Sequence, residues 1–188
     1  MSDLLLEAVK SGDTSKISDF LKHGDDVNMR DADGATLLML AAHAGNLNVV
    51  KMLLAAGADV KAMDDLRWTA LMKAVYNAEL DQGFPDVVQT LIDAGADIES
   101  EIVYGTRPLM LAAGAGEAGV VQVLLQAGVD PKAKNEGGRT ALMMVKEKDY
   151  IEVINLLHEA ESLMEEGESC GSRNPPGVNV VTFLKPKK

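Results

Sequence analysis

The sequence predicts an all-α solenoid of stacked helical units, and two recurring phrases of residues predict it. The first phrase occupies residues 36–42 and returns in related form after 33, 38 and again 33 residues. The second is a glycine followed two positions later by an aspartate, and it keeps the same spacing. A unit that restarts at such a period is typical of a repeat protein, whose units bury their apolar faces against their neighbours. The first phrase begins at Thr36, Thr69, Arg107 and Thr140, and the glycines of the second are Gly24, Gly57, Gly95 and Gly128.

The first part of each unit is predicted to be a turn followed by a short helix, as residues 31–45 illustrate. Residues 31–35 are polar and contain a glycine, which is typical of a tight turn. Thr36 can cap the helix that follows by accepting a hydrogen bond from a free backbone amide. Ala41 and Ala42 fall on the apolar face of this helix, and their small side chains allow a neighbouring helix to approach closely.

The second part of the unit is predicted to be another helix with a buried stripe. Val49, Val50, Leu53 and Leu54 have the spacing of residues that share one helix face. Gly57 is expected to end this helix, because glycine enters the left-handed conformation without steric cost. The chain then leads outward into the next turn.

A projecting turn and two helices in 33 residues resemble the ankyrin repeat, whose signature includes Thr-Pro-Leu-His-x-Ala. The resemblance covers about residues 2–162 and implies five repeats in one ankyrin repeat domain, residues 1–162. A linker is expected at 163–177, and an apolar, basic tail at 178–188. The expected repeats are about 2–30, 31–63, 64–101, 102–134 and 135–162.

Two departures from that signature are expected to alter local packing. Methionine replaces the signature histidine in all four full copies, so neighbouring repeats are expected to pack through flexible thioethers. Arg107 replaces the capping threonine, although Pro108 suits the first turn of a helix, so an irregular junction is expected there. The methionines are Met39, Met72, Met110 and Met143.

Repeat three carries five extra residues near 78–82, which lengthen its first helix or the loop after it. Two interpretations remain open. The extra residues are a tolerated loop insertion, or they form an acidic lip that extends a binding groove next to Tyr76. The second interpretation follows from the tendency of insertions in solenoids to fall on one face, often the binding face.

Both ends of the repeat array have the polar residues of capping units. The first repeat is rich in Ser, Asp and Lys, and the fifth places Lys146 and Asp149 where other repeats have small residues. Terminal repeats need a polar outer face because water covers it. The solenoid is therefore expected to begin and end inside this chain.

The period is lost after Glu161, and the tail that follows leaves two interpretations open. Residues 165–177 are rich in Glu, Gly, Ser and Pro, as in a flexible linker, and 178–184 are mainly apolar before a lysine-rich end. The tail is disordered, or it docks on its own body, on a neighbouring copy or on a partner. Docking in an acidic groove of its own body would make it compete with a partner, and its removal would then raise affinity.

The resemblance implies that a partner binds on the concave side, made by the projecting turns and the exposed face of the first helices. Trp68, Tyr76 and Tyr104 fall there on adjacent repeats, and such side chains supply much of the binding energy at interfaces. The alternative for Trp68 is local packing against Leu66 and Arg107. The residues that the repeat register places on this surface are Asp33, His43, Asp65, Leu66, Trp68, Tyr76, Asn77, Tyr104, Thr106, Glu136 and Arg139.

Composition and motifs exclude several classes of function. The net charge of −11 argues against nucleic-acid binding, because carboxylates repel phosphates. A single cysteine, Cys170, cannot form an internal disulfide, and the N-terminus has neither a basic segment nor a long apolar run. A cytoplasmic protein without a membrane span is therefore expected. No sequence motif for catalysis, a metal or a cofactor is present.

These observations together predict a protein-binding module, acting as an adaptor, inhibitor or escort, and not an enzyme. The expected partner is another protein with a basic or apolar surface. A structural subunit that associates through its tail is the main alternative, and a small enzyme or ligand-binding protein is the least favoured.

Overall fold

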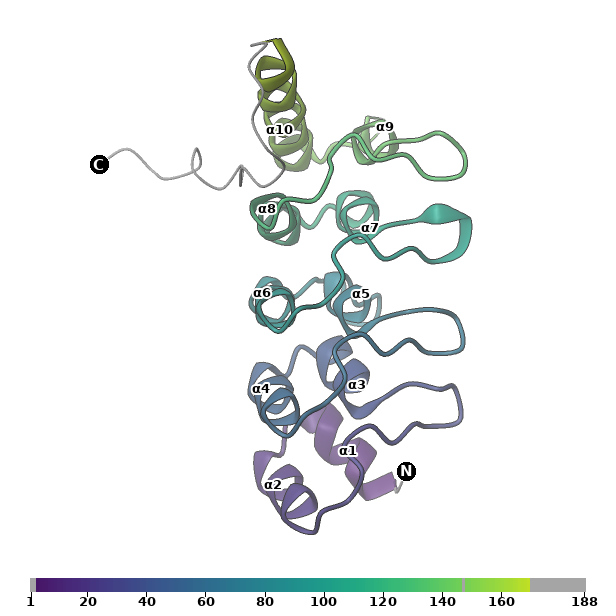
Figure 1. The fold of residues 1–188 in the computed structure, drawn as a ribbon, viewed down its shortest axis with the longest axis vertical. Coiled ribbons are helices and arrows are strands. Elements are labelled where there is room, and N and C mark those ends of the chain that lie inside the picture. Colours follow the sequence, from purple (N-terminus) through teal and green to yellow (C-terminus); the bar gives the residue numbers. More distant parts are fainter. Residues whose placement is uncertain (1–2, 147, 170–188) are drawn as a thin grey trace, which may run out of the picture.

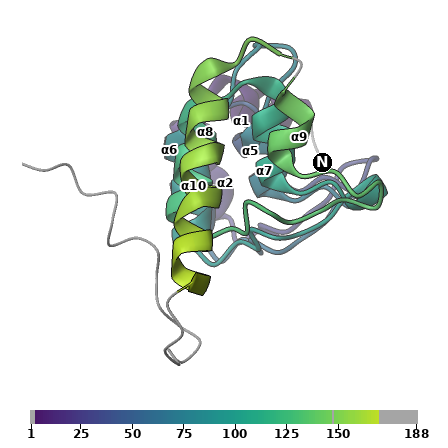
Figure 2. The same cartoon turned by 90° about the horizontal axis from the view of Figure 1, so that it is seen from above.

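The computed structural model describes residues 3–146 and 148–169, which form ten α-helices arranged in five stacked pairs (Figure 1). One helix of each pair lies in an inner layer next to the projecting turns, and the other lies in an outer layer (Figure 2). The predicted all-α stack is confirmed. The pairs are α1 (Asp3–Ser11) with α2 (Thr14–Lys22), α3 (Leu37–His43) with α4 (Leu47–Ala55), α5 (Ala70–Val75) with α6 (Pro85–Asp93), α7 (Pro108–Ala115) with α8 (Ala118–Gln126), and α9 (Ala141–Val145) with α10 (Ile151–Ser169).

The core between the two layers is aliphatic and rich in alanine. Ala41 and Ala42 in α3, and the equivalent alanines of α5 and α7, are fully buried. Val49, Val50 and Leu53 of α4 are buried as well, as the predicted stripe requires. Small side chains in the inner layer let adjacent repeats pack closely, so the turns that the inner helices carry lie in register along one side of the stack (Figure 1).

The threonine caps predicted from the repeats are confirmed. The hydroxyl groups of Thr36, Thr69 and Thr140 each accept a hydrogen bond of 3.3 Å from the amide three residues later. These caps satisfy helix amides that would otherwise lack a partner. Gly57, which follows α4 with a φ of +88°, ends that helix as predicted.

The junction before α7 is irregular, as the loss of the capping threonine predicted. Arg107 makes no side-chain cap, and its guanidinium instead pairs with Glu99 and Glu101. The turn before it contains a short 3-10 helix, η1 (Val103–Gly105), in which Tyr104 has a left-handed φ of +64°. An ion-pair cluster thus stands where the other repeats have a hydroxyl cap.

The methionine ladder packs as predicted over three repeats. Met39, Met72 and Met110 are buried, and the Met39 sulfur also accepts a hydrogen bond from the Thr36 amide. Met143 is 49% exposed, because it lies in the last repeat of the described stack. The three buried thioethers thus belong to repeats that have a following unit stacked on them.

The extra residues of repeat three lengthen a loop and not a helix. Helix α5 ends at Val75, and the chain makes an isolated antiparallel bridge between Asn77 and Gln82 before α6 begins. The amide of Phe84 then donates to the Ala74 carbonyl, a bond equivalent to those at the same point of other repeats. The insertion therefore leaves the stacking register unchanged.

The expected linker at 163–177 is wrong at its start. Helix α10 continues through residues 163–169, because the heptad after Glu161 keeps good helix formers although the repeat period has ended. The remainder of the expected linker and the tail at 178–188 lie outside the described residues.

Candidate partner-binding groove

A groove of about 660 Å³ runs along the inner face between repeats two and three. Its walls are the two projecting turns, the exposed sides of α3 and α5, and the inserted loop after α5. We call it the inner groove. The residues that line it are Lys10, Asp31, Asp33, Ala35, Met39, Leu40, His43, Ala44, Asp64, Asp65, Leu66, Lys73, Asn77, Glu79 and Leu80.

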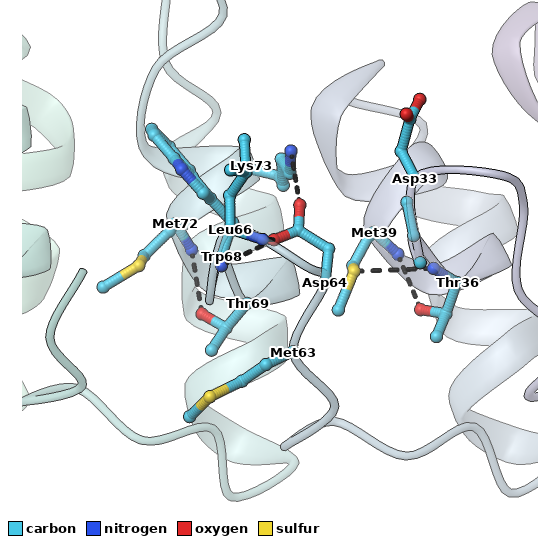
Figure 3. A network of polar contacts seen from close by, with 12 residues as sticks. Asp33, Thr36, Met39, Met63, Asp64, Leu66, Trp68, Thr69, Met72 and Lys73 are labelled. Atoms are coloured by element: carbon cyan, nitrogen blue, oxygen red, sulfur yellow. Dashed lines mark hydrogen bonds and ion pairs between the residues drawn. The ribbon is translucent and has the colours of Figure 1, made fainter. Parts of the chain in front are cut away.

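The turn of repeat three is held by Asp64, which is almost completely buried (Figure 3). One carboxylate oxygen accepts hydrogen bonds from the amides of Leu66 at 3.0 Å and Trp68 at 2.8 Å. The other lies 2.9 Å from the Lys73 ammonium group. Charge-assisted bonds of this kind are stronger than neutral ones, so this turn is fixed to its own inner helix.

Trp68 contributes to the same network and is half-buried. The Lys73 ammonium lies 5.2 Å from the centre of the indole ring, within the range of a cation–π interaction. The indole thus lies beside Lys73, which also pairs with Asp64 (Figure 3). Local packing of Trp68 therefore includes Lys73, which the sequence analysis did not name.

The inserted loop forms the end wall of the inner groove, and Asn77 organises it. The Asn77 side-chain amide donates to the His43 carbonyl at 2.6 Å, and its oxygen accepts from the amides of Glu79 and Leu80. Asn77 is only 2% exposed. The expectation that Asn77 contacts a partner is therefore corrected: its polar atoms bind the protein's own backbone, and it presents Glu79 and Leu80 instead.

The inner groove is acidic. It contains five carboxylates, those of Asp31, Asp33, Asp64, Asp65 and Glu79, against two lysines. Lys73 is already paired with Asp64. Burial lowers the pKa of His43 below its ordinary value near 6.5, so this ring is neutral at pH 7 and supplies no compensating cation.

Two exposed leucines flank these carboxylates. Leu66, in the turn of repeat three, is 66% exposed, and Leu80, in the inserted loop, is 53% exposed. Large apolar side chains this exposed beside a groove mark a contact site more often than scattered surface leucines do. The groove can therefore bury apolar groups while attracting positive charge.

The structure brings together some of the predicted contact residues and separates others. Four of the predicted residues line the inner groove: Asp33, His43, Asp65 and Leu66. Trp68 is not among the lining residues, but its ring contacts Lys73, which is one of them. Tyr104, Thr106, Glu136 and Arg139 lie on the turns of repeats four and five, further along the same row.

Tyr76, another of the predicted aromatic contacts, follows the inner helix of repeat three. It follows α5 at the end opposite to Trp68, and its hydroxyl group donates to Asp81 at 2.8 Å. This hydrogen bond raises the pKa of Tyr76. Trp68 and Tyr76 thus flank α5, Trp68 before its start and Tyr76 after its end.

Sequence reasoning missed Lys73 and Leu80. For both residues, a departure from the repeat pattern could have indicated a special role. Lys73 stands where the equivalent positions are Leu40, Leu111 and Met144, and Leu80 is the large apolar residue of an otherwise polar insertion. Asp64 was missed because aspartates recur in every turn, and only burial distinguishes it.

The described residues contain no cluster of three or more His, Cys, Asp or Glu side chains arranged to hold a metal ion. Within the same part of the chain, no helix is both long and apolar enough to cross a membrane. The carboxylates of the inner groove are thus spread along its walls.

The family model of ankyrin repeats matches residues 5–102 and 80–166. Bovine mitochondrial disaggregase is 34% identical over 167 residues, which cover 86% of this chain and 23% of that protein. Rat ankyrin repeat and SAM domain-containing protein 6 is 35% identical over 96 residues, or 50% of this chain and 10% of that protein.

A shorter relative also matches. Mouse protein phosphatase 1 regulatory subunit 27 is 32% identical over 106 residues, which cover 56% of this chain and 66% of that protein. The match spans less than a quarter of the length of the first two relatives. What these proteins share with this chain is the repeat region.

Proposed function

Because the chain belongs to the ankyrin repeat family, we propose that it is a protein-binding module, acting as an adaptor, inhibitor or escort, whose main contact site is the inner groove. Ankyrin repeats generally mediate protein–protein interaction, and a fold alone does not specify where or what they bind. The observation that supports this location is the combination of the carboxylates of Asp33, Asp65 and Glu79 with the exposed side chains of Leu66 and Leu80.

The groove supports a partner segment that carries lysine or arginine beside apolar side chains. Asp33, Asp65 and Glu79 would attract the cations and speed association. The apolar side chains would cover Leu66 and Leu80, whose burial supplies affinity. The network around Asp64 holds this surface in shape before binding, so little ordering entropy is lost when a partner binds.

The turns of repeats four and five would extend the contact beyond the groove. Tyr104 is 73% exposed at the tip of its turn. The Tyr104 carbonyl accepts a hydrogen bond from the Glu136 amide, which ties the fourth turn to the fifth. Trp68, beside the groove, would be a second, partly preformed contact. The presence of a single cysteine, which cannot form an internal disulfide, favours the cytoplasm as the compartment of binding.

Affinity capture with matched variants tests this proposal. Leu66→Asp is expected to weaken partner binding by about 2 kcal/mol or more, or roughly 30-fold, because it removes an apolar contact and adds a repelling charge. Ile151→Asp is the control, since Ile151 is equally exposed at 69% but lies at the first residue of α10, where aspartate suits the helix dipole.

The amounts of each protein captured by the intact chain and by the two variants are then compared. A partner that is retained by the intact protein and by Ile151→Asp, and lost by Leu66→Asp, supports the groove. Equal retention by all three proteins would place the contact elsewhere, and turnover of a small molecule in the groove would favour the enzyme alternative.

A further inference from the structure

A second groove lies on the outer layer, at the C-terminal end of the stack. It is apolar, and its walls come from α8 with the loop after it and from the second half of α10. We call it the outer groove. Its apolar lining includes Leu125, Val129, Leu156, Leu163 and Met164.

Helix α10 is unusual in its length. It has 19 residues, whereas the outer helices α4, α6 and α8 each have nine. Leu157 is buried, whereas the side chains of residues 158–164, the two turns that follow it, are half-buried or exposed. Because most helical stability in proteins comes from the packing of an apolar face, a contact that covers these half-buried residues would stabilise the second half of α10.

The second half of α10 is also strongly acidic in sequence. The segment 159–168 has five glutamates and no lysine or arginine. Carboxylates near the C-terminus of a helix oppose its dipole, whereas cations there are favourable. A basic partner at this end would therefore stabilise α10. The glutamates are Glu159, Glu161, Glu165, Glu166 and Glu168.

The chain itself carries a segment with the matching chemistry. Residues 178–184 contain five apolar side chains and are followed by three lysines in residues 185–188. The eight residues 170–177 can span about 26 Å when extended. The rise along α10 from Ser169 back to Glu159 is only about 15 Å, so the segment can return to the outer groove.

We propose that Val178–Leu184 docks in the outer groove of its own chain, with the terminal lysines beside the glutamates of α10. The apolar side chains would cover Leu125, Leu163 and Met164, and the lysines would complement the helix end. Because this seat is on the outer layer, the docked segment leaves the inner groove open. It would act as a clasp on the last repeat and not as a competitor of the partner.

Hydrogen exchange on the full-length chain tests this proposal. The double variant Val181→Asp with Phe183→Asp places charges on the apolar side chains of the segment. It is expected to speed amide exchange in residues 159–169 by about tenfold, because that part of α10 would lose its cover. The control is Asn179→Asp with Thr182→Asp, which adds the same charge at polar positions of the same segment and is expected to change these rates less than about twofold.

Three results would overturn the proposal. The first is equal exchange in residues 159–169 for both double variants. The second is a change confined to residues 31–44 and 64–80, which would place the segment in the inner groove. The third is protection of α10 that disappears on dilution, which would show that the segment comes from a second copy.

Discussion

Replacing Gly83 by alanine is expected to lower the free energy of unfolding by about 3 kcal/mol. A Cβ atom built at Gly83 would lie 2.3 Å from the backbone oxygen of Val75 and 2.8 Å from a methyl carbon of Val120. The Val75 oxygen cannot move away freely, because α5 ends there and the next loop is bonded to Ala74. The extra methyl group would therefore push repeats three and four apart.

Gly114→Ala is the matched control, and it should raise the free energy of unfolding where Gly83→Ala lowers it. Gly114 lies in α7, and among the described residues outside its own helix no atom would lie within 4 Å of a Cβ atom there. Alanine in a helix is more favourable than glycine by about 0.5–1 kcal/mol, so the control should be more stable than the original protein. Urea unfolding of the three proteins measures both effects, and an equal change in the two variants would contradict the packing described for Gly83.

Replacing Asp64 by alanine is expected to cost about 2–3 kcal/mol of stability. The change leaves the amides of Leu66 and Trp68 without their acceptor and removes the partner of the Lys73 ammonium group. The turn would loosen, and Leu66 would lose its fixed position beside the inner groove. Partner binding should therefore weaken as well, even at temperatures where the variant remains folded.

Asp31→Ala is the matched control, because it removes the turn hydrogen bonds of repeat two without removing an ion pair to the inner helix. Asp31 accepts the equivalent hydrogen bonds from the amides of Asp33 and Ala35, but Leu40 stands where repeat three has Lys73. Its loss should cost only about 1 kcal/mol. Thermal unfolding compares the two variants, and losses of equal size would show that the pair between Asp64 and Lys73 adds nothing to the turn.

The repeated parts of the fold could be predicted because they depend on local and periodic signals. Thr36 and its equivalents predicted the caps, and the alanines of the inner helices predicted their close packing. Arg107 predicted an irregular junction because the hydroxyl group of the repeat was missing there. In each case the sequence of a single unit contains the cause, and the neighbouring units repeat it.

The inner groove could be predicted only in part, because its shape depends on residues that interrupt the repeat. The insertion after α5 has no equivalent in the other units, so its sequence did not show that Asn77 would bind the His43 carbonyl. The sequence predicts both Trp68 and Tyr76 on the partner-binding surface, and α5 lies between them in the chain. Aromatic residue type alone could not reveal that the Tyr76 hydroxyl group donates to Asp81 in the inserted loop.

The central claim is that a protein partner binds in the inner groove. Hydrogen exchange of this protein, alone and with a captured partner, tests it most directly. If the partner binds in the inner groove, amide exchange should slow in residues 31–44 and 64–80. These residues form the two turns, the inner helices and the inserted loop. Protection restricted to the outer helices α4, α6 and α8, with the inner face unchanged, would contradict the claim.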